Sequence, residues 1–151
     1  MEIQNILGYL LNTSARLIKR KMDKSLERYN LTTSQWAVIK LLFNKTQLTQ
    51  VEIAYELNSD RATAGAVILN LYEKKYINKL VDKNDRRSYV ISLTEKAKDA
   101  VKEIDLIVEN VTEEALKGLS DKNVEDLYES LKHINKNLSE GQNGNLERRN
   151  F

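Results

Sequence analysis

The stretch "LTQVEIAYELNSDRATAGAVILNLYEKKYI", residues 48–77, decides the fold because it contains two short amphipathic helices joined by a polar turn. Thr49 followed by Glu52 is a capping box, which predicts a helix start, and residues 58–60 are all favourable caps for a second helix. The inward side of the first helix is predicted to be Val51 or Ile53, Ala54 and Leu57, and that of the second Ala64, Val67, Ile68 and Leu71. This spacing predicts a helix-turn-helix, although the same corner occurs as a simple packing unit in many helical domains.

The residues that follow predict a β-hairpin. The runs "INKLV" and "SYVISL" are rich in strand-forming residues and flank the charged segment "DKNDRR", residues 82–87. A hairpin directly after a helix-turn-helix is a wing, and a narrow loop carrying Lys83, Arg86 and Arg87 would reach a phosphate backbone or the minor groove of A·T-rich DNA. The alternative is an ordinary solvated turn, because Asp, Asn and Lys are common in hairpin loops.

Helices are predicted on both sides of this region. Apolar residues recur at three- and four-residue steps from Ile3 to a helix end near Asn30, and Thr32 with Gln35 forms a capping box that opens the next helix. The buried face of that helix is predicted to be Trp36, Ile39, Leu42 and Phe43. Two further apolar stripes, broken at Ser120, cover Val101 to Ala115 and Val124 to Leu138.

The stripes indicate how the chain is organised. They could pack on each other within one chain, but together with the first helix they exceed what a small winged domain can cover, which favours a homodimer. We expect an N-terminal dimerisation helix at 1–30, a winged helix-turn-helix lobe at 31–94, dimerisation helices at 95–138 and a flexible tail at 139–151. The expected dimer contacts are Ile3, Ile6, Val108, Val111, Leu131, Ile134 and Leu138.

Composition excludes several classes of protein. The 151 residues include no Pro, five Gly and 30% charged residues, which favours helices, and no Cys, which excludes a disulfide framework and a thiol sensor. A single histidine, His133, which we expect at the surface, and the lack of a Gly-rich loop leave no catalytic constellation, so we expect neither an enzyme nor a metal or cofactor site. Acidic Glu2 and the absence of a long apolar run predict a cytoplasmic chain without a membrane segment.

The net charge of +2 is unevenly distributed. Arg16 to Arg28 carries six basic and two acidic residues, and Arg61 to Arg87 carries seven and three, so each segment is +4. Asp99 to Glu140 carries five basic and eleven acidic residues, a local charge of −6. A polyanion such as double-stranded DNA is therefore predicted to bind the middle of the chain.

Several motifs together resemble the MarR family of transcriptional regulators over essentially the whole chain. They are "LGYLLNTSARLIKR", "LTTSQWAVIKLL", "LTQVEIAYEL", "DRATAGAVILNLYEKKYI" and "DKNDRRSYVISLTEKAKD". The resemblance implies a mainly α-helical dimer with a winged helix-turn-helix in each subunit, which represses genes and releases DNA when a small ligand, often an aromatic acid, binds. The chain departs from the family pattern at Ala66 and Asn70, where many relatives carry arginine, and at Lys75, where they carry glycine.

A DNA surface can be predicted on this basis. Small and methyl-bearing side chains on the outward face of the second helix suit thymine methyl groups, which predicts A·T-rich half-sites read partly by shape. A two-fold dimer predicts that the half-sites form an inverted repeat with centres about 10 bp apart. Residues at the start of the preceding helix are expected to contact phosphates. The predicted DNA-binding residues are Thr49, Gln50, Ser59, Arg61, Ala62, Thr63, Ala66, Asn70, Lys83, Arg86 and Arg87.

The predicted effector site is carried by fewer residues. Relatives bind ligands between the dimer layer and the DNA-binding lobe, so Tyr9, Arg16 and Trp36 are candidates for an aromatic wall and a cation that binds a carboxylate. The alternative is that Trp36 belongs to the core and Arg16 is a solvated charge. A winged helix used only for protein interaction is the rival function, but it gives no reason for the cations of the wing.

Overall fold

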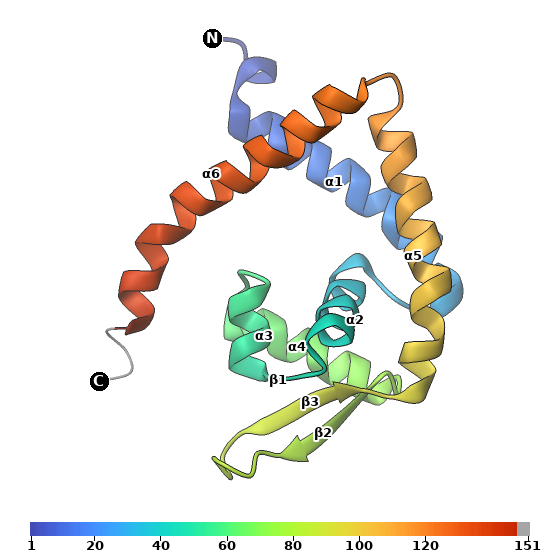
Figure 1. The fold of residues 1–151 in the computed structure, drawn as a ribbon, viewed down its shortest axis with the longest axis vertical. Coiled ribbons are helices and arrows are strands. Elements are labelled where there is room, and N and C mark those ends of the chain that lie inside the picture. Colours follow the sequence, from blue (N-terminus) through green and yellow to red (C-terminus); the bar gives the residue numbers. More distant parts are fainter. Residues whose placement is uncertain (148–151) are drawn as a thin grey trace. The chain divides into compact units, whose positions relative to one another are not determined.

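Helices make up most of the fold (Figure 1). In this computed structural model the backbone is described for residues 1–147 and the side chains for residues 1–139. The described elements are α1 (Leu7–Leu26), α2 (Thr33–Lys45), α3 (Gln50–Glu56), α4 (Arg61–Glu73), α5 (Glu95–Leu116), α6 (Asp121–Glu147), β1 (Gln47–Thr49), β2 (Ile77–Val81) and β3 (Tyr89–Leu93), with 3-10 turns η1 (Ile3–Asn5) and η2 (Glu27–Tyr29). The predicted class, mainly α with a hairpin wing after a helix-turn-helix, is confirmed.

The chain divides into two compact units, Met1–Thr112 and a second that begins at Glu113. The first unit contains the winged helix-turn-helix. The second contains α6, which continues past residue 138 as far as Glu147, so the flexible tail predicted from 139 is helical over its described part. Residues 148–151 lie outside the described residues. Among residues 1–147, no helix has the length and apolar character that crossing a bilayer requires.

The predicted helix starts are confirmed at the level of hydrogen bonds. Thr32 Oγ1 accepts from the N–H of Gln35 at 3.3 Å while Gln35 Oε1 accepts from the N–H of Thr32 at 3.1 Å. Thr49 and Glu52 form the equivalent pair at the start of α3. Asp60 caps α4 by accepting from the N–H of Thr63 at 2.7 Å. These reciprocal bonds satisfy donors that the first turn of a helix would otherwise leave free.

The core of the first unit is formed by side chains from α1 to α5 and from the sheet. Its largest fully buried side chains are Leu26, Val38, Ile39, Leu42, Ile53, Ile68, Leu71, Ile77, Ile91, Val101 and Ile104. Of the two alternatives for α3, Ile53 is buried and Val51 is exposed. Phe43 was predicted to be buried but is 46% exposed, because the buried face of α2 runs through Val38, Ile39 and Leu42 and leaves Phe43 beside its edge.

The wing belongs to a three-stranded antiparallel sheet with the order β1-β3-β2. Leu48 of β1 and Lys79 of β2 both stand opposite Ile91 of β3, and Val81 stands opposite Tyr89 at the outer end of the hairpin. Strand β1 was not predicted, since it has only three residues. Pairing with β1 leaves β2 as the free edge of the wing.

Three turns are closed by residues with a left-handed backbone, Asn30 (φ 54°), Asn58 (φ 49°) and Lys75 (φ 63°). After α4 the N–H of Tyr76 donates to the carbonyl of Leu71 at 2.9 Å, the bond expected of a Schellman motif. Lys75 thus keeps the shape of this turn although it stands where many relatives carry glycine. A left-handed conformation costs a residue with a Cβ atom roughly 1–2 kcal/mol.

Substitution of Lys75 by glycine should therefore stabilise the chain. We expect Lys75→Gly to raise the free energy of unfolding by about 0.5 kcal/mol, because relief of the strained backbone is partly offset by the greater freedom of glycine in the unfolded chain. Urea unfolding measures this change. The matched control is Lys102→Gly within α5, which should lower the free energy of unfolding by about 1 kcal/mol. Equal losses in the two variants would contradict the prediction.

Candidate nucleic-acid interface

Helix α4 presents an exposed face of small side chains. Ala62, Thr63, Ala66 and Asn70 are all exposed, as the predicted outward face requires. The polar groups on this face are bonded internally: Thr63 Oγ1 donates to Asp60 Oδ2 at 2.8 Å, and Asn70 Nδ2 donates to the carbonyl of Ala66 at 3.1 Å. Methyl groups therefore dominate what this face offers to a ligand.

The first turn of α4 is held by a negative charge. Hydrogen bonds from the backbone N–H and then the hydroxyl of Thr63 lower the pKa of Asp60 below its ordinary value. Arg61 follows the cap and is exposed, and Ser59 is half-buried with its hydroxyl donating to the carbonyl of Asp60 at 3.3 Å. Of these two predicted contacts, Arg61 is the one whose side chain is exposed and charged.

Helix α3 approaches α4 closely at its start. Gln50 Nε2 lies 3.5 Å from the carbonyl oxygen of Arg61, and a Cβ atom on Gly65 would lie 2.9 Å from that amide nitrogen. Gly65 thus leaves room for the Gln50 side chain against the recognition helix. Thr49, the other predicted phosphate contact on this helix, uses its hydroxyl in the capping box, where it also lies 3.1 Å from Glu52 Oε2. The close approach of Gln50 to Gly65 was not predicted.

The tip of the wing is organised by its aspartates. Asp82 Oδ1 accepts from the N–H of Asn84 at 2.9 Å, and Asp85 Oδ1 accepts from the N–H of Arg87 at 3.0 Å. A backbone bond from Asp82 to the carbonyl of Ser88, 2.9 Å long, closes the loop. The predicted contact side chains of the loop, Lys83, Arg86 and Arg87, are all exposed. The acidic residues of this loop therefore shape a turn that presents cations.

Two substitutions of Asp85 should distinguish the effect of its negative charge from the effect of the hydrogen bond that it accepts. Asp85→Ala removes the acceptor for the Arg87 N–H, so we expect about threefold weaker DNA binding although a negative charge is lost, because the loop must then be ordered on binding. Asp85→Asn keeps an acceptor oxygen and removes the charge, so binding should be equal to or tighter than wild type. Titration of both variants with the same duplex measures their DNA affinities. Tighter binding by Asp85→Ala would mean that the negative charge of Asp85, and not its hydrogen bond, determines its effect on DNA affinity.

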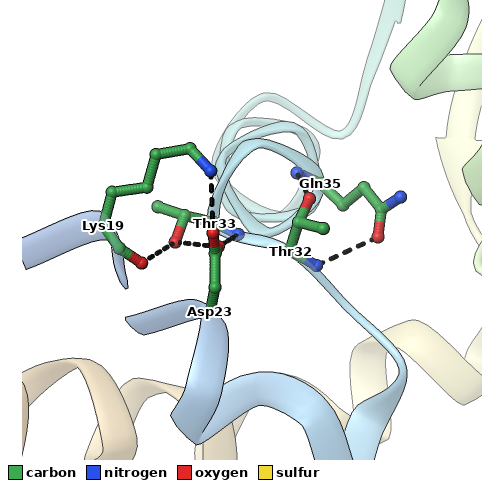
Figure 2. Close-up of polar contacts among 5 residues, drawn as sticks. All are labelled: Lys19, Asp23, Thr32, Thr33 and Gln35. Atoms are coloured by element: carbon green, nitrogen blue, oxygen red, sulfur yellow. Dashed lines mark hydrogen bonds and ion pairs between the residues drawn. The ribbon is translucent and has the colours of Figure 1, made fainter. Parts of the chain in front are cut away.

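A polar cluster joins the end of α1 to the start of α2 (Figure 2). Asp23 Oδ1 accepts from the backbone N–H of Thr33 at 2.6 Å and from its hydroxyl at 2.7 Å, and Asp23 Oδ2 pairs with Lys19 Nζ at 2.8 Å. Burial alone would raise the pKa of Asp23, but the bonds from Lys19 and Thr33 outweigh it and lower the pKa. The carboxylate thus acts as an additional cap on α2.

The contribution of this cluster should depend on pH. A carboxyl group whose pKa is lowered by folding stabilises the fold above its unfolded pKa of about 3.9, and this stabilisation is lost as the pH falls through the lower folded pKa. We expect Asp23→Asn to cost about 1 kcal/mol near pH 7, because solvent reaches this pair, and almost nothing near pH 2. Urea titrations at both pH values measure this difference. The control Asp126→Asn, in an exposed pair with Lys122, should cost about 0.3 kcal/mol.

The C-terminal end of α4 is tied to the segment between α1 and α2. Lys74 Nζ donates to the carbonyl of Asn30 at 2.6 Å and to Gln35 Oε1 at 3.1 Å. The hydroxyl of Tyr76 donates to the carbonyl of Tyr29 at 2.7 Å, and burial raises the pKa of Tyr76. These bonds hold the recognition helix at a fixed place on the first unit.

The predicted effector residues are not brought together as an open site. Trp36 is only 5% exposed and belongs to the core, as the alternative interpretation of this residue expects. Tyr9 is 40% exposed and Arg16 is exposed. The surface hollow that includes Arg16 is lined only by residues 16–27 of α1 and η2, without Tyr9.

The predicted dimer contacts differ in how far their side chains are exposed in the single chain. Ile3, Ile6 and Leu138 are exposed, and Val108, Leu131 and Ile134 are half-buried. Val111 is 6% exposed and is part of the core, so little of its side chain remains for a partner. The first helix also begins later than predicted, because Ile6 has an extended backbone (φ −83°, ψ 122°) that separates η1 from α1.

Comparisons with known proteins agree with this fold. Residues 31–89 match the model of the MarR family. An uncharacterised HTH-type transcriptional regulator of Bacillus subtilis (strain 168), YwoH, is 32% identical over 119 residues, which cover 79% of this chain and 86% of YwoH.

Two solved structures are similar over most of their length. The S. aureus MepR–DNA complex matches with a TM-score of 0.80 and 26% identity, covering 87% of this chain and 98% of that one. Bordetella bronchiseptica BpsR, whose DNA binding is described as regulated by 6-hydroxynicotinic acid, matches with a TM-score of 0.83 and 21% identity, covering 89% and 96%. The match to the MarR model and the sequence identity to YwoH together show that the chain belongs to the MarR family of transcriptional regulators, which are not enzymes.

Proposed function

We propose that this protein is a transcriptional repressor that binds an A·T-rich inverted repeat as a homodimer and releases it when a small aromatic acid binds. The observation that carries the proposal is the wing, where two aspartates hold a loop that exposes Lys83, Arg86 and Arg87 beside a recognition helix with an exposed face. Cations on a narrow loop suit phosphates and the minor groove. MepR, which has the same fold, is seen bound to DNA.

The preference for A·T-rich DNA follows from the chemistry of α4. The hydroxyl of Thr63 and the amide of Asn70 are already bonded within the helix, so few donors remain for guanine or adenine edges. The methyl groups of Ala62 and Ala66 can contact thymine methyl groups in the major groove. Specificity should then depend largely on the shape and the flexibility of the site.

The homodimer is supported by an apolar face that a single chain leaves exposed. On η1 and α1 the exposed fractions are 54% for Ile3, 58% for Leu7, 48% for Leu10 and 54% for Leu17. Large apolar side chains grouped on one helix favour burial against a partner, and a two-fold axis would place two recognition helices on an inverted repeat.

An effector remains part of the proposal. Arg16 and Tyr9 lie on the same face of α1, seven residues apart, and offer a guanidinium and a phenol ring to a carboxylated aromatic ligand. The relative BpsR responds to 6-hydroxynicotinic acid, a ligand of this chemical class.

The test is fluorescence anisotropy with the DNA upstream of the protein's own gene and a scrambled duplex of equal composition, at two salt concentrations. Binding to the native fragment that is tighter by about 10³-fold or more supports a specific regulator. Addition of aromatic acids to that complex then tests release, and loss of the response in Arg16→Ala assigns the site. Equal binding to both duplexes at every salt concentration would contradict the proposal of a specific site in the upstream DNA.

A further inference from the structure

Lys79 on strand β2 is held between two tyrosine rings. Its Nζ lies 5.3 Å from the centroid of the Tyr72 ring and 5.9 Å from that of the Tyr89 ring. Tyr72 belongs to the recognition helix α4, and Tyr89 is the first residue of β3, beside the wing loop. The rings are 49% and 53% exposed, whereas Lys79 is half-buried. A cation of the wing therefore lies beside the C-terminal end of the recognition helix.

The charge of Lys79 is not neutralised by the chain. Within residues 1–139, whose side chains the structure describes, no carboxylate pairs with its ammonium group, unlike the paired lysines 19, 40, 98, 122 and 132. The two ring faces attract the ammonium group but accept none of its three hydrogen bonds in the ordinary sense. The three N–H donors of Lys79 remain available to an anion. The rings already restrict the conformational freedom of the side chain, so less entropy is lost when Lys79 binds an anion.

The position of this cation matches a specific part of a DNA duplex. If α4 enters the major groove and the wing loop follows the minor groove, the phosphate strand that separates the grooves must pass between them. Lys79 would lie near that strand, since its ammonium group is close both to Tyr72, in the last turn of α4, and to Tyr89, at the start of β3.

We propose that Lys79 is a phosphate contact positioned by Tyr72 and Tyr89 on the DNA strand between the two grooves. The inference rests on the proposed DNA binding and adds a residue on the β2 strand to the predicted set. It differs from Lys83, Arg86 and Arg87 because its ammonium group is ordered by the folded chain before DNA arrives.

The test measures the dependence of DNA affinity on salt. Lys79→Met keeps the apolar stem against the rings and removes the charge, so affinity for native and scrambled duplexes should both fall about eightfold near 0.1 M salt, with the slope of log K against log salt smaller by about 0.9. Lys79→Arg should retain the wild-type slope. Tyr72→Leu keeps the cation, so its slope should be unchanged while affinity falls about threefold.

The controls separate this contact from folding and from the proposed function. Lys102→Met removes an exposed lysine of α5 and should leave affinity and slope unchanged. Lys79→Gln is the second variant should Lys79→Met unfold, as judged by circular dichroism. Specific binding by wild type with an unchanged slope in the Lys79 variants overturns this inference alone. Failure of wild type to bind either duplex overturns the proposed function and this inference together.

Discussion

Replacement of both Arg86 and Arg87 by alanine is expected to weaken binding to every duplex by about 60-fold near 0.1 M salt, because each phosphate contact contributes about 0.9 to the salt slope. Both side chains are exposed on a loop whose shape is set by Asp82 and Asp85, so their removal leaves the fold intact. Anisotropy titrations at several salt concentrations measure affinity and slope together.

The matched control for the two arginines is removal of two cations outside the wing. Lys122→Ala with Lys132→Ala removes the same charge from α6, where each lysine forms an exposed pair within the helix. We expect less than a twofold change in affinity, since these lysines lie outside the proposed DNA-binding lobe and each is already paired with a carboxylate. An equal loss in the two double variants would mean that net charge, and not the wing, governs binding.

Introduction of charge into the exposed face of α1 is expected to separate the proposed dimer and abolish tight binding to the proposed inverted repeat. Leu10→Glu with Leu17→Glu places two carboxylates on one face, at side chains that are 48% and 54% exposed in the single chain. Loss of the second DNA-binding lobe should lower affinity for the full repeat by about 10²-fold or more, with binding to a half-site unchanged. Sedimentation velocity and titrations with full and half sites measure these effects.

Phe43→Glu is the control for that experiment. Phe43 is a large apolar side chain of similar exposure, 46%, at the end of α2 and not on α1. The Phe43→Glu variant should remain dimeric and bind the full repeat as wild type does. A monomeric wild type, or a dimer that survives the α1 substitutions, would contradict the proposed interface.

Local signals in the sequence were sufficient for most of the fold. The capping boxes at Thr32 and Thr49 depend on residues close in the chain, so their geometry follows from their chemistry. The exposed face of α4 was likewise predictable from helical periodicity, because Ala64, Ile68 and Leu71 fix which side is buried.

Features that depend on distant contacts could not be predicted in this way. Strand β1 is too short to carry a pattern and exists because β3 offers it a partner. Periodicity placed Trp36 and Phe43 on one face but could not say that the core would bury the first and leave the second exposed. The position of Lys79 depends on Tyr72 and Tyr89, which lie on different elements.

The small side chains on α4 have a consequence for how this regulator can evolve. Ala62 and Ala66 are exposed and make no contact that the core requires, and arginine is nearly as good a helix former as alanine. A single Ala→Arg change at either position would add a cation able to bind guanine in two hydrogen bonds without a cost in folding. Paralogues that differ only there could acquire separate operators after gene duplication while keeping the same core.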